Sequence, residues 1–316
     1  MTRSRRPRSA AALTLAAALV VFAGKVAAYL VTGSVALLSD AAESVANVAA
    51  AVAVVIAVRA ARRPPDFEHP YGHGKAEYLS SALEGSMILI AAGAILTTAF
   101  QRLLDPQPLE RVVAGLAVAA AATAINLFVA ARLREVGVRH GSPALIANAR
   151  HLMTDVWSSV GVLASVVVVA ATGWTVVDPV VALLVGVHVV RVGWAVLTEA
   201  FSSLMDARLP GAEERAIMNV LNDDREVRGF HRLRSRRSGH ARFVEVDVFV
   251  APDLTVAEAH AIANRVEANV ADRLDDVTVT VHVEPFVSGR RDVTLEPRDE
   301  YGGSGRPSWE RGREGP

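Results

Sequence analysis

The chain has 316 residues, of which 52% are hydrophobic, with a formal net charge of zero and no cysteine. Its mean hydropathy is +0.31, and its apolar residues form long Ala, Val and Leu blocks, which is typical of an integral membrane protein. The lack of cysteine excludes disulfide scaffolding and thiolate sites for soft Cu(I), which leaves His, carboxylate and amide groups as metal ligands.

Six apolar segments are long enough to span a bilayer as helices. They cover residues 10–31, 35–58, 79–101, 111–131, 144–171 and 174–198. The basic stretch before the first segment raises the alternative of a signal peptide, but the apolar run continues to Val31 and five more spans follow. We therefore expect an uncleaved first helix, a basic segment over residues 1–9 and a six-helix transmembrane domain over residues 10–206.

Basic residues are concentrated in the connections expected after the second and fourth spans. These residues are Arg59, Arg62, Arg63, Lys75, Arg132, Arg134, Arg139 and Arg150. Because cytoplasmic loops carry an excess of Lys and Arg, both termini are predicted to be cytoplasmic, in a protein of the inner (plasma) membrane.

The chain changes character after Ala207, where short apolar stripes alternate with polar residues. The periodicities predict a helix at 213–221, strands at 230–234 and 242–250, a helix at 255–274 and a strand at 277–283. This α-β-β-α-β order predicts an α+β domain over residues 207–288, with its helices on one face of a small sheet. Residues 289–316, rich in Gly, Arg, Glu and Pro, are predicted to be a disordered tail.

An imidazole and a carboxylate, His151 and Asp155, enter the fifth span four residues apart and share one helix face. Ionisable groups at membrane depth are costly and persist mainly where they bind ions or relay protons. Glu43 and Asn47 repeat this spacing in the second span, with Asp40 as an auxiliary ligand. Two such helices predict a cage of three oxygens and one nitrogen, suited to Zn(II), Fe(II), Mn(II) or Co(II). The alternative is that each group only hydrogen-bonds to a neighbouring helix.

A second group of metal-ligand types lies in the loop after the second span. Asp66, His69 and His73, with Glu68 as an auxiliary, fall within eight residues beside two glycines that permit sharp turns. Taken alone, this loop is better explained as a solvated polar segment than as a metal site.

Together these motifs resemble the cation diffusion facilitator family. The resemblance rests on Thr32–Val35, the second-span acidic motif, His69–Glu77, His151 with Asp155, Ser203–Asp206 and the terminal α-β-β-α-β domain, and it covers about residues 10–286. It is closest to bacterial ferrous-iron and zinc efflux transporters. It implies a homodimer of six-helix protomers with a ferredoxin-like, metallochaperone-like cytoplasmic domain, exporting divalent metal in exchange for protons.

The resemblance also implies roles for individual residues. It assigns the transport site to Glu43, Asn47, His151 and Asp155, a loop site to Asp66, His69 and His73, a dimer-interface metal cluster to His231, Asp247, His260, His282 and Glu284, and an inter-subunit ion pair to Lys75 and Asp206. Strand alternation supports the cluster independently, because His282 and Glu284 share the face opposite Val281 and Val283.

The second-span ligands depart from the family pattern. Relatives usually have Asp or His in place of Glu43 and Asp in place of Asn47, so this site carries one formal negative charge fewer. A neutral amide is a weaker ligand, so we expect either that a preference for zinc relaxes toward Mn(II) or Fe(II), or that Asp40 replaces Asn47 as a ligand. Zinc is the first expected ion, followed by Fe, Mn, Co and Cd.

Other classes of function remain open to test. A membrane-embedded metal sensor would bind metal without vectorial transport. An intramembrane metallohydrolase would need an H-E-x-x-H arrangement, which the sequence lacks. The segment from Arg232 to Arg242 is rich in arginine. Such charges more often mark a solvated face or contact anionic lipid than bind nucleic acid. We predict a transporter, not an enzyme, with no nucleic-acid partner.

Overall fold

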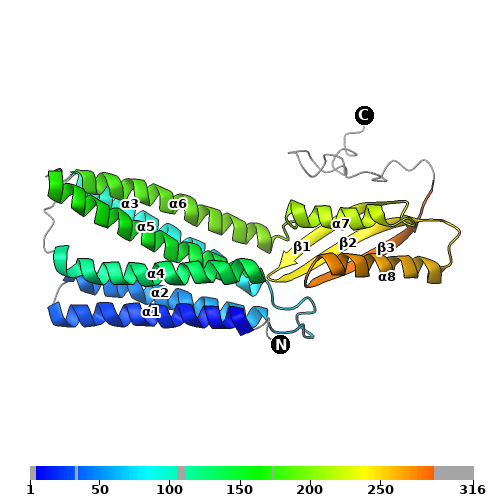
Figure 1. Cartoon of the computed structure of the whole chain (residues 1–316), viewed down its shortest axis with the longest axis horizontal. Coiled ribbons are helices and arrows are strands. Elements are labelled where there is room, and N and C mark those ends of the chain that lie inside the picture. The colour runs from blue at the N-terminus through cyan, green and yellow to red at the C-terminus, as the bar shows by residue number, and fades with distance from the viewer. Residues whose placement is uncertain (1–4, 33–34, 105–111, 173, 175, 288–316) are drawn as a thin grey trace. The chain divides into compact units, whose positions relative to one another are not determined.

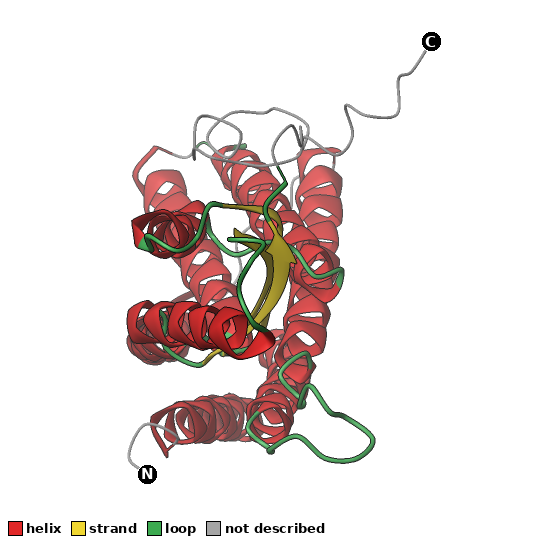
Figure 2. Ribbon diagram, turned by 90° about the vertical axis from the view of Figure 1, so that its right-hand side faces the viewer, coloured by secondary structure: helices red, strands yellow, loops and turns green. Residues whose placement is uncertain are grey.

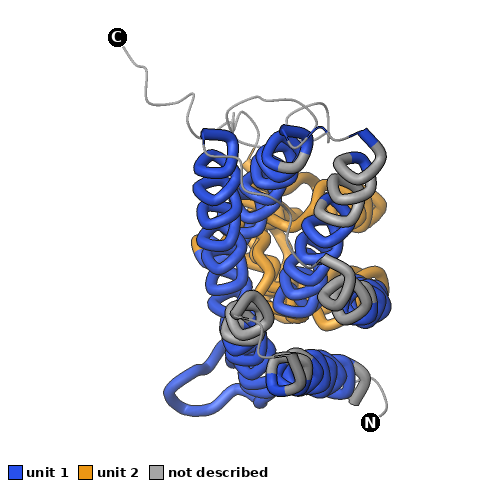
Figure 3. Tube along the Cα trace, turned by 90° about the vertical axis from the view of Figure 1, so that its left-hand side faces the viewer, with its two compact units in different colours: residues 1–204 blue, residues 205–316 orange. Residues whose placement is uncertain are grey.

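The computed structural model describes the chain except for residues 1–4, 33–34, 105–111, 173, 175 and 288–316. The side chains of some helical residues, among them Asp40 and Glu43, also lie outside this description. The chain divides into two compact units, residues 1–204 and residues 205–316 (Figure 3). The tail predicted at 289–316 falls outside the described residues and stays a prediction.

Unit 1 is helical, and its described part contains six helices that run side by side (Figure 1). They are α1 (Arg5–Thr32), α2 (Val35–Ala61), α3 (Ala76–Leu104), α4 (Val112–His140), α5 (Pro143–Thr172) and α6 (Val177–Leu204). Among the described residues, three stretches are long and apolar enough to cross a membrane: Pro7–Gly24, Ala76–Leu104 and Pro179–Leu204. Helices are favoured there because their backbone groups are satisfied internally.

The connection after the fourth span differs from the prediction. α4 continues to His140 and α5 begins at Pro143, so the expected basic loop is largely helical. Its arginines lie on helices, Arg132, Arg134 and Arg139 on α4 and Arg150 on α5. Arg132 and Arg139 pair with Glu135 at 2.6 and 3.5 Å, one helical turn away on either side. Such pairs, and cations near a helix C-terminus, stabilise the extension.

α5 connects the two apolar cores of unit 1. Leu145 and Leu152 pack with buried residues of α1, α2 and α4, whereas Ala147 packs with buried residues of α3 and α6. Neighbouring residues of α5 therefore face different parts of the bundle. The polar residues His151 and Asn148 contact Asn47 of α2 and Glu84 of α3.

α3 and α6 lie close together because glycines stand at their contact. A Cβ atom on Gly85 would lie 2.9 Å from the backbone nitrogen of Leu197, and one on Gly193 would lie 2.9 Å from Cγ2 of Ile88. Small residues of this kind let helix backbones approach in membrane proteins.

Unit 2 confirms the predicted α-β-β-α-β order. Its elements are α7 (Gly211–Asp223), β1 (Gly229–Ser238), β2 (Ala241–Val250), α8 (Val256–Arg273) and β3 (Val277–Pro285). The strand order is β1-β2-β3, with β1 antiparallel and β3 parallel to β2. Both helices cover the same face of this sheet (Figures 1 and 2).

The two faces of β2 have different surroundings. Val244, Val246 and Val248 are buried in one core with Leu221 of α7 and Val266 of α8. The residues between them point to the face that the helices leave open, as the period of two requires. The apolar stripe thus fixes which side chains face away from the core.

Substitution of Gly85 tests the close packing of α3 and α6. We expect Gly85→Ala to destabilise unit 1 by about 1–3 kcal/mol, because its Cβ would meet the α6 backbone. Gly93→Ala on the same helix is the matched control, since among the described residues no atom outside the nearby backbone of α3 lies within 4 Å of its added Cβ. Thermal unfolding of the purified protein in detergent measures both. An equal melting temperature for the two variants would contradict the proposed packing constraint.

Candidate functional site

One predicted ligand of α2 and one of α5 are in contact inside unit 1. Nε2 of His151 lies 3.2 Å from Oδ1 of Asn47. The residue His151 is 4% exposed, and Asp155, one turn further along α5, is half-buried. The side chains of Glu43 and Asp40 lie outside the described residues, so the full cage stays a prediction.

The other nitrogen of His151 faces a carboxylate that the sequence reasoning missed. Nδ1 of His151 lies 3.8 Å from Oε2 of Glu84 on α3. The second oxygen of Glu84, Oε1, accepts a hydrogen bond of 2.7 Å from Nδ2 of Asn148. Glu84 and Asn148 are 1% and 2% exposed. The imidazole is therefore flanked by α2 through one nitrogen and by α3 through the other.

Glu84 belongs to a buried polar stripe on α3. Glu77, Ser80, Ser81 and Glu84 are all buried. Their spacing of three and four residues gives them a common helix face, which was the sequence signal available for finding Glu84. Glu77 accepts hydrogen bonds from the Ser142 hydroxyl and, at 3.4 Å, from the backbone N–H of Ala144 at the start of α5. A carboxylate is favourable at this helix end.

The loop before α3 folds its three predicted ligands together. Nδ1 of His69 lies 3.2 Å from Oδ1 of Asp66, and Nε2 of His73 lies 3.3 Å from Oδ2 of the same carboxylate. Gly72 has a φ of 79°, a conformation that favours glycine, and its N–H donates to the His69 carbonyl at 2.9 Å. Glu68 is not among the ligand atoms that converge here.

The carboxylate of this loop is held in its charged form. The backbone N–H of His69 donates to Oδ1 of Asp66 at 2.7 Å. This hydrogen bond, together with one from the His69 imidazole and the electrostatic attraction of the His73 imidazole, keeps the pKa of Asp66 below its usual value. An ionised carboxylate beside two imidazoles is a suitable donor set for a divalent cation.

In unit 2, three predicted ligands converge on the sheet face that the helices leave open. Nε2 of His231 lies 3.3 Å from Oδ2 of Asp247 and 3.7 Å from Oε1 of Glu284. They come from β1, β2 and β3 respectively, and His231 and Asp247 are directly paired across β1 and β2. The His231 ring also packs on buried Phe249, with ring centroids 4.7 Å apart.

A β-bulge directly follows His231. The register shifts between His231 and Arg234, and Arg232 has a φ of 51°. A bulge re-aims side chains, and here Arg232 reaches Oδ2 of Asp247 at 3.4 Å. The sequence reasoning did not anticipate this irregularity, which no composition signal marks.

His282 and His260 are not brought into this group by the single chain. Nε2 of His282 lies 3.9 Å from Oε1 of Glu284, and its side chain is 68% exposed. His260 on α8 is exposed, and its Nε2 lies 3.3 Å from Nδ2 of Asn264. Their assignment to the cluster stays a prediction.

The predicted ion-pair residues have contacts within their own units. Nζ of Lys75 donates to the Leu204 carbonyl at 3.2 Å, and Arg236 lies 3.4 Å from Oδ1 of Asp206. The inter-subunit pair of Lys75 with Asp206 stays a prediction.

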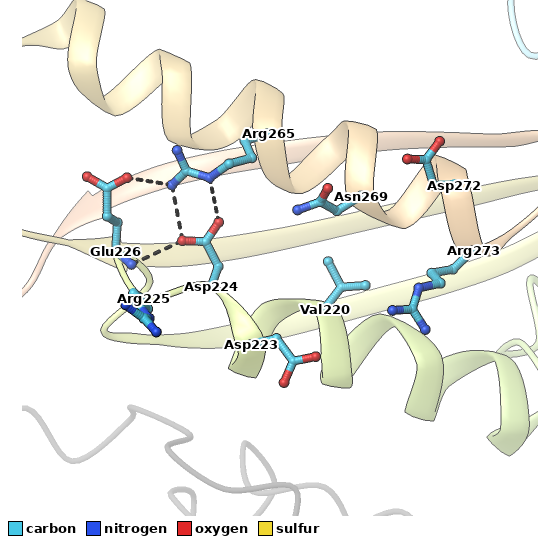
Figure 4. Close-up of a pocket in the computed structure, with 9 residues that line it drawn as sticks. All are labelled: Val220, Asp223, Asp224, Arg225, Glu226, Arg265, Asn269, Asp272 and Arg273. Carbon is cyan, nitrogen blue, oxygen red and sulfur yellow. Dashed lines mark hydrogen bonds and ion pairs between the residues drawn. The ribbon is translucent and has the colours of Figure 1, made fainter.

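A cavity between α7 and α8 is lined largely by charged residues, and one of them, Arg265, pairs with two others. Arg265 donates to Asp224 at 2.7 and 3.1 Å and to Glu226 at 2.7 Å (Figure 4). The hydrogen bonds from Arg265 hold the pKa of Asp224 below 3.8. These hydrogen bonds hold α8 against the end of α7, so we interpret them as stabilising the fold of unit 2.

Both units match families of known proteins. Residues 11–205 match the cation efflux transmembrane domain, and residues 209–286 match the cytoplasmic domain of cation efflux proteins. Together these matches include nearly all of the described chain.

Several relatives are similar along most of their length. The chain is 45% identical over 285 residues to an uncharacterized transporter of Synechocystis sp., covering 90% of this chain and 92% of the relative. It is 33% identical over 276 residues to the cation-efflux pump FieF of Pectobacterium atrosepticum, covering 87% and 92%. The metal-bound C-terminal domain of the CzcD transporter from Thermotoga maritima is 35% identical, covering 23% of this chain and 87% of that domain, with a TM-score of 0.23.

The Asp224 contact predicts a pH dependence for unit 2. Because the pKa of Asp224 is lowered on folding, its stabilisation is present at pH values above the usual pKa of an aspartate and is lost as the pH falls through the lowered pKa. Asp224→Asn should cost about 1 kcal/mol at pH 7, seen as roughly fivefold faster hydrogen exchange in α7 and α8 peptides of the full-length protein. The difference should shrink under acid conditions. Asp223→Asn, at an exposed neighbour, is the control; an equal effect of both variants would rule out the Arg265 contact as the cause.

Proposed function

Given that the chain belongs to the cation efflux family, also called the cation diffusion facilitator family, we propose that it exports a divalent metal cation in exchange for protons. It is a multi-pass membrane transporter with a cytoplasmic domain and not an enzyme. The proposal goes beyond the family in naming a substrate of the Zn, Fe, Mn and Co class, proton antiport and alternating access.

The contact of His151 with Asn47 is the observation that carries the proposal. Nε2 of His151 and Oδ1 of Asn47 lie 3.2 Å apart in the interior of unit 1. Two ligands about 2.0–2.1 Å from a tetrahedral zinc ion are separated by about 3.3 Å, so both atoms are near enough to share one ion. Asp155 on the same face of α5 supplies the negative charge that a divalent cation requires.

Proton coupling follows from the chemistry of these ligands. A metal ion binds the neutral imidazole and the ionised carboxylates, so protons compete with it for His151, Asp155 and Glu43. With the site open to the cytoplasm, metal displaces protons; with the site open to the other side, protons displace metal. Inward proton flow then drives metal out of the cell.

The two remaining clusters have accessory roles in this proposal. Residues 10–206 form the transport domain, and residues 207–288 form a metal-binding dimerisation domain. The loop ligands Asp66, His69 and His73 receive the ion near the entrance. The group of His231, Asp247 and Glu284 binds metal in the cytoplasmic domain, where an ion would displace Arg232 from Asp247. The homodimer would then add His260 and His282 to this group.

We place the protein in the inner membrane as a homodimer, with both termini in the cytoplasm. The positive residues at the ends of α2, α4 and α5 favour this orientation. The ion pair of Lys75 with Asp206 would join the two subunits near the membrane surface.

A membrane-embedded metal sensor is the second candidate, because the loop and sheet clusters would bind metal without transport. A sensor needs no ligand pair in the interior of the membrane unit. The contact of His151 with Asn47 therefore favours a transporter.

Removal of either α5 ligand tests the transport site. In proteoliposomes with purified protein, we expect His151→Ala and Asp155→Ala to abolish zinc-dependent proton flux and leave the dimer intact, because both variants lose a ligand that metal and protons share. His188→Ala, at an exposed residue of α6, should retain flux. Normal flux in both α5 variants would rule out the site, and zinc binding without uptake by the unmodified protein would favour the sensor.

The choice of metal depends on Asn47 in this proposal. Asn47→Asp restores a charged oxygen ligand, so we expect zinc uptake to gain on manganese and ferrous iron uptake by about tenfold or less, a difference of up to about 1.4 kcal/mol. Competition between Zn, Mn, Fe, Co and Cd in the same vesicles measures the ranking. An unchanged ranking would show that the amide does not set selectivity.

A further inference from the structure

We propose that Glu84 of α3 is a positioning residue for the transport site, which accepts the Nδ1–H of His151 and thereby directs Nε2 toward the transported ion. This inference rests on the proposed function, because it assumes that His151 binds the substrate metal. In this inference α3 also contributes to metal binding, although the predicted metal ligands lie on α2 and α5.

The two nitrogens of His151 have different neighbours. Nε2 lies 3.2 Å from Oδ1 of Asn47, a proposed ligand on α2. Nδ1 lies 3.8 Å from Oε2 of Glu84, on the α3 side. One imidazole nitrogen can bind a metal only when it carries no proton, so the proton of the neutral ring must then reside on the other nitrogen. Metal at Nε2 therefore makes Nδ1 a hydrogen-bond donor that faces Glu84.

The atoms on the Nδ1 side have no competing hydrogen-bond partner within the described part of the chain. Nδ1 of His151 and Oε2 of Glu84 are both fully buried and make no hydrogen bond. At 3.8 Å they are a few tenths of an ångström beyond hydrogen-bonding range, a gap that a small rotation of the ring closes. Leaving both groups unpaired costs free energy, so a bound metal that fixes the proton on Nδ1 strengthens their contact.

Glu84 is itself held in place from α5. Nδ2 of Asn148 donates to its Oε1 at 2.7 Å, which leaves Oε2 directed at the imidazole. Asn148 precedes His151 by three residues on α5, so the amide and the imidazole present the same helix face to α3. The carboxylate, its amide anchor and the ligand form a connected group between two helices.

A carboxylate behind a metal-binding histidine has two known physical effects. It fixes the orientation and protonation pattern of the ring, and it makes the ligating nitrogen more basic. Loss of such a partner costs about 10–100-fold in metal affinity, with the ligand itself still present. Loss of the Glu84 carboxylate should therefore mainly raise KM, the substrate concentration at half-maximal rate.

The test measures KM and maximal rate for zinc uptake by the full-length protein in proteoliposomes. We expect Glu84→Gln, which keeps the shape of the side chain, to raise KM about 10–100-fold, with the maximal rate retained within about threefold. Glu77→Gln is the matched control, because Glu77 is equally buried on the same helix and contacts Ser142 and Ala144. We expect it to leave KM unchanged.

Further variants keep the inference testable if Glu84→Gln does not fold as a dimer. Glu84→Asp keeps the charge but shortens its reach, and should raise KM less than Glu84→Gln. Asn148→Ala removes the anchor and should raise KM in the same direction, with no further rise when it is combined with Glu84→Gln. Additive effects of the two substitutions would contradict a connected group.

Two results would overturn the inference while leaving the proposed function intact. One is an unchanged KM in folded Glu84 or Asn148 variants, when His151→Ala still abolishes uptake. The other is complete loss of uptake at every zinc concentration in Glu84→Gln, which would make Glu84 a direct ligand. Absence of zinc uptake by the unmodified protein would instead refute the proposed function, and the positioning role with it.

Discussion

The structure of unit 1 depends on the polar contacts that α5 makes inside an otherwise apolar bundle. Glu77 of α3 accepts hydrogen bonds at the start of α5, and Glu84 of α3 meets Asn148 and His151 further along. Buried carboxylates are expensive at membrane depth unless such partners are present. Because α5 also contributes to both apolar cores, these contacts fix its rotation as well as its height relative to α3. The direction in which His151 points follows from that placement.

Unit 2 uses one strand for two purposes. The valines of β2 bury one face against α7 and α8, and the period of two then forces Asp247 onto the opposite face. His231 and Glu284 reach the same place from β1 and β3. The apolar stripe of β2 therefore determines the face of the sheet on which the polar group lies. A substitution that shifted the register of β2 by one residue would bury Asp247 and separate it from His231 and Glu284.

Features carried by local periodicity could be predicted from the sequence, and features that depend on contacts between elements could not. The α-β-β-α-β order followed from alternating valines and helical spacing, and the spacing of His151 and Asp155 identified their common face. Glu84 lies 67 residues before His151 in the chain, so no spacing rule connects them. The bulge at Arg232 and the helical extension around Glu135 depend on local hydrogen bonds and ion pairs that composition does not encode.

The surroundings of His151 argue that its polar neighbours do more than stabilise the bundle. A histidine that served packing alone would have both ring nitrogens satisfied, since each buried unpaired polar group costs about 1–3 kcal/mol. Here Nε2 meets the amide of Asn47, whereas Nδ1 and the facing oxygen of Glu84 are buried and accept or donate no hydrogen bond among the residues that the structure describes. Such groups in native proteins call for an explanation, for example a bound ion or water. A metal ion at Nε2 would resolve this one by fixing the proton on Nδ1, so the same ion that occupies the site would also complete the contact between α3 and α5.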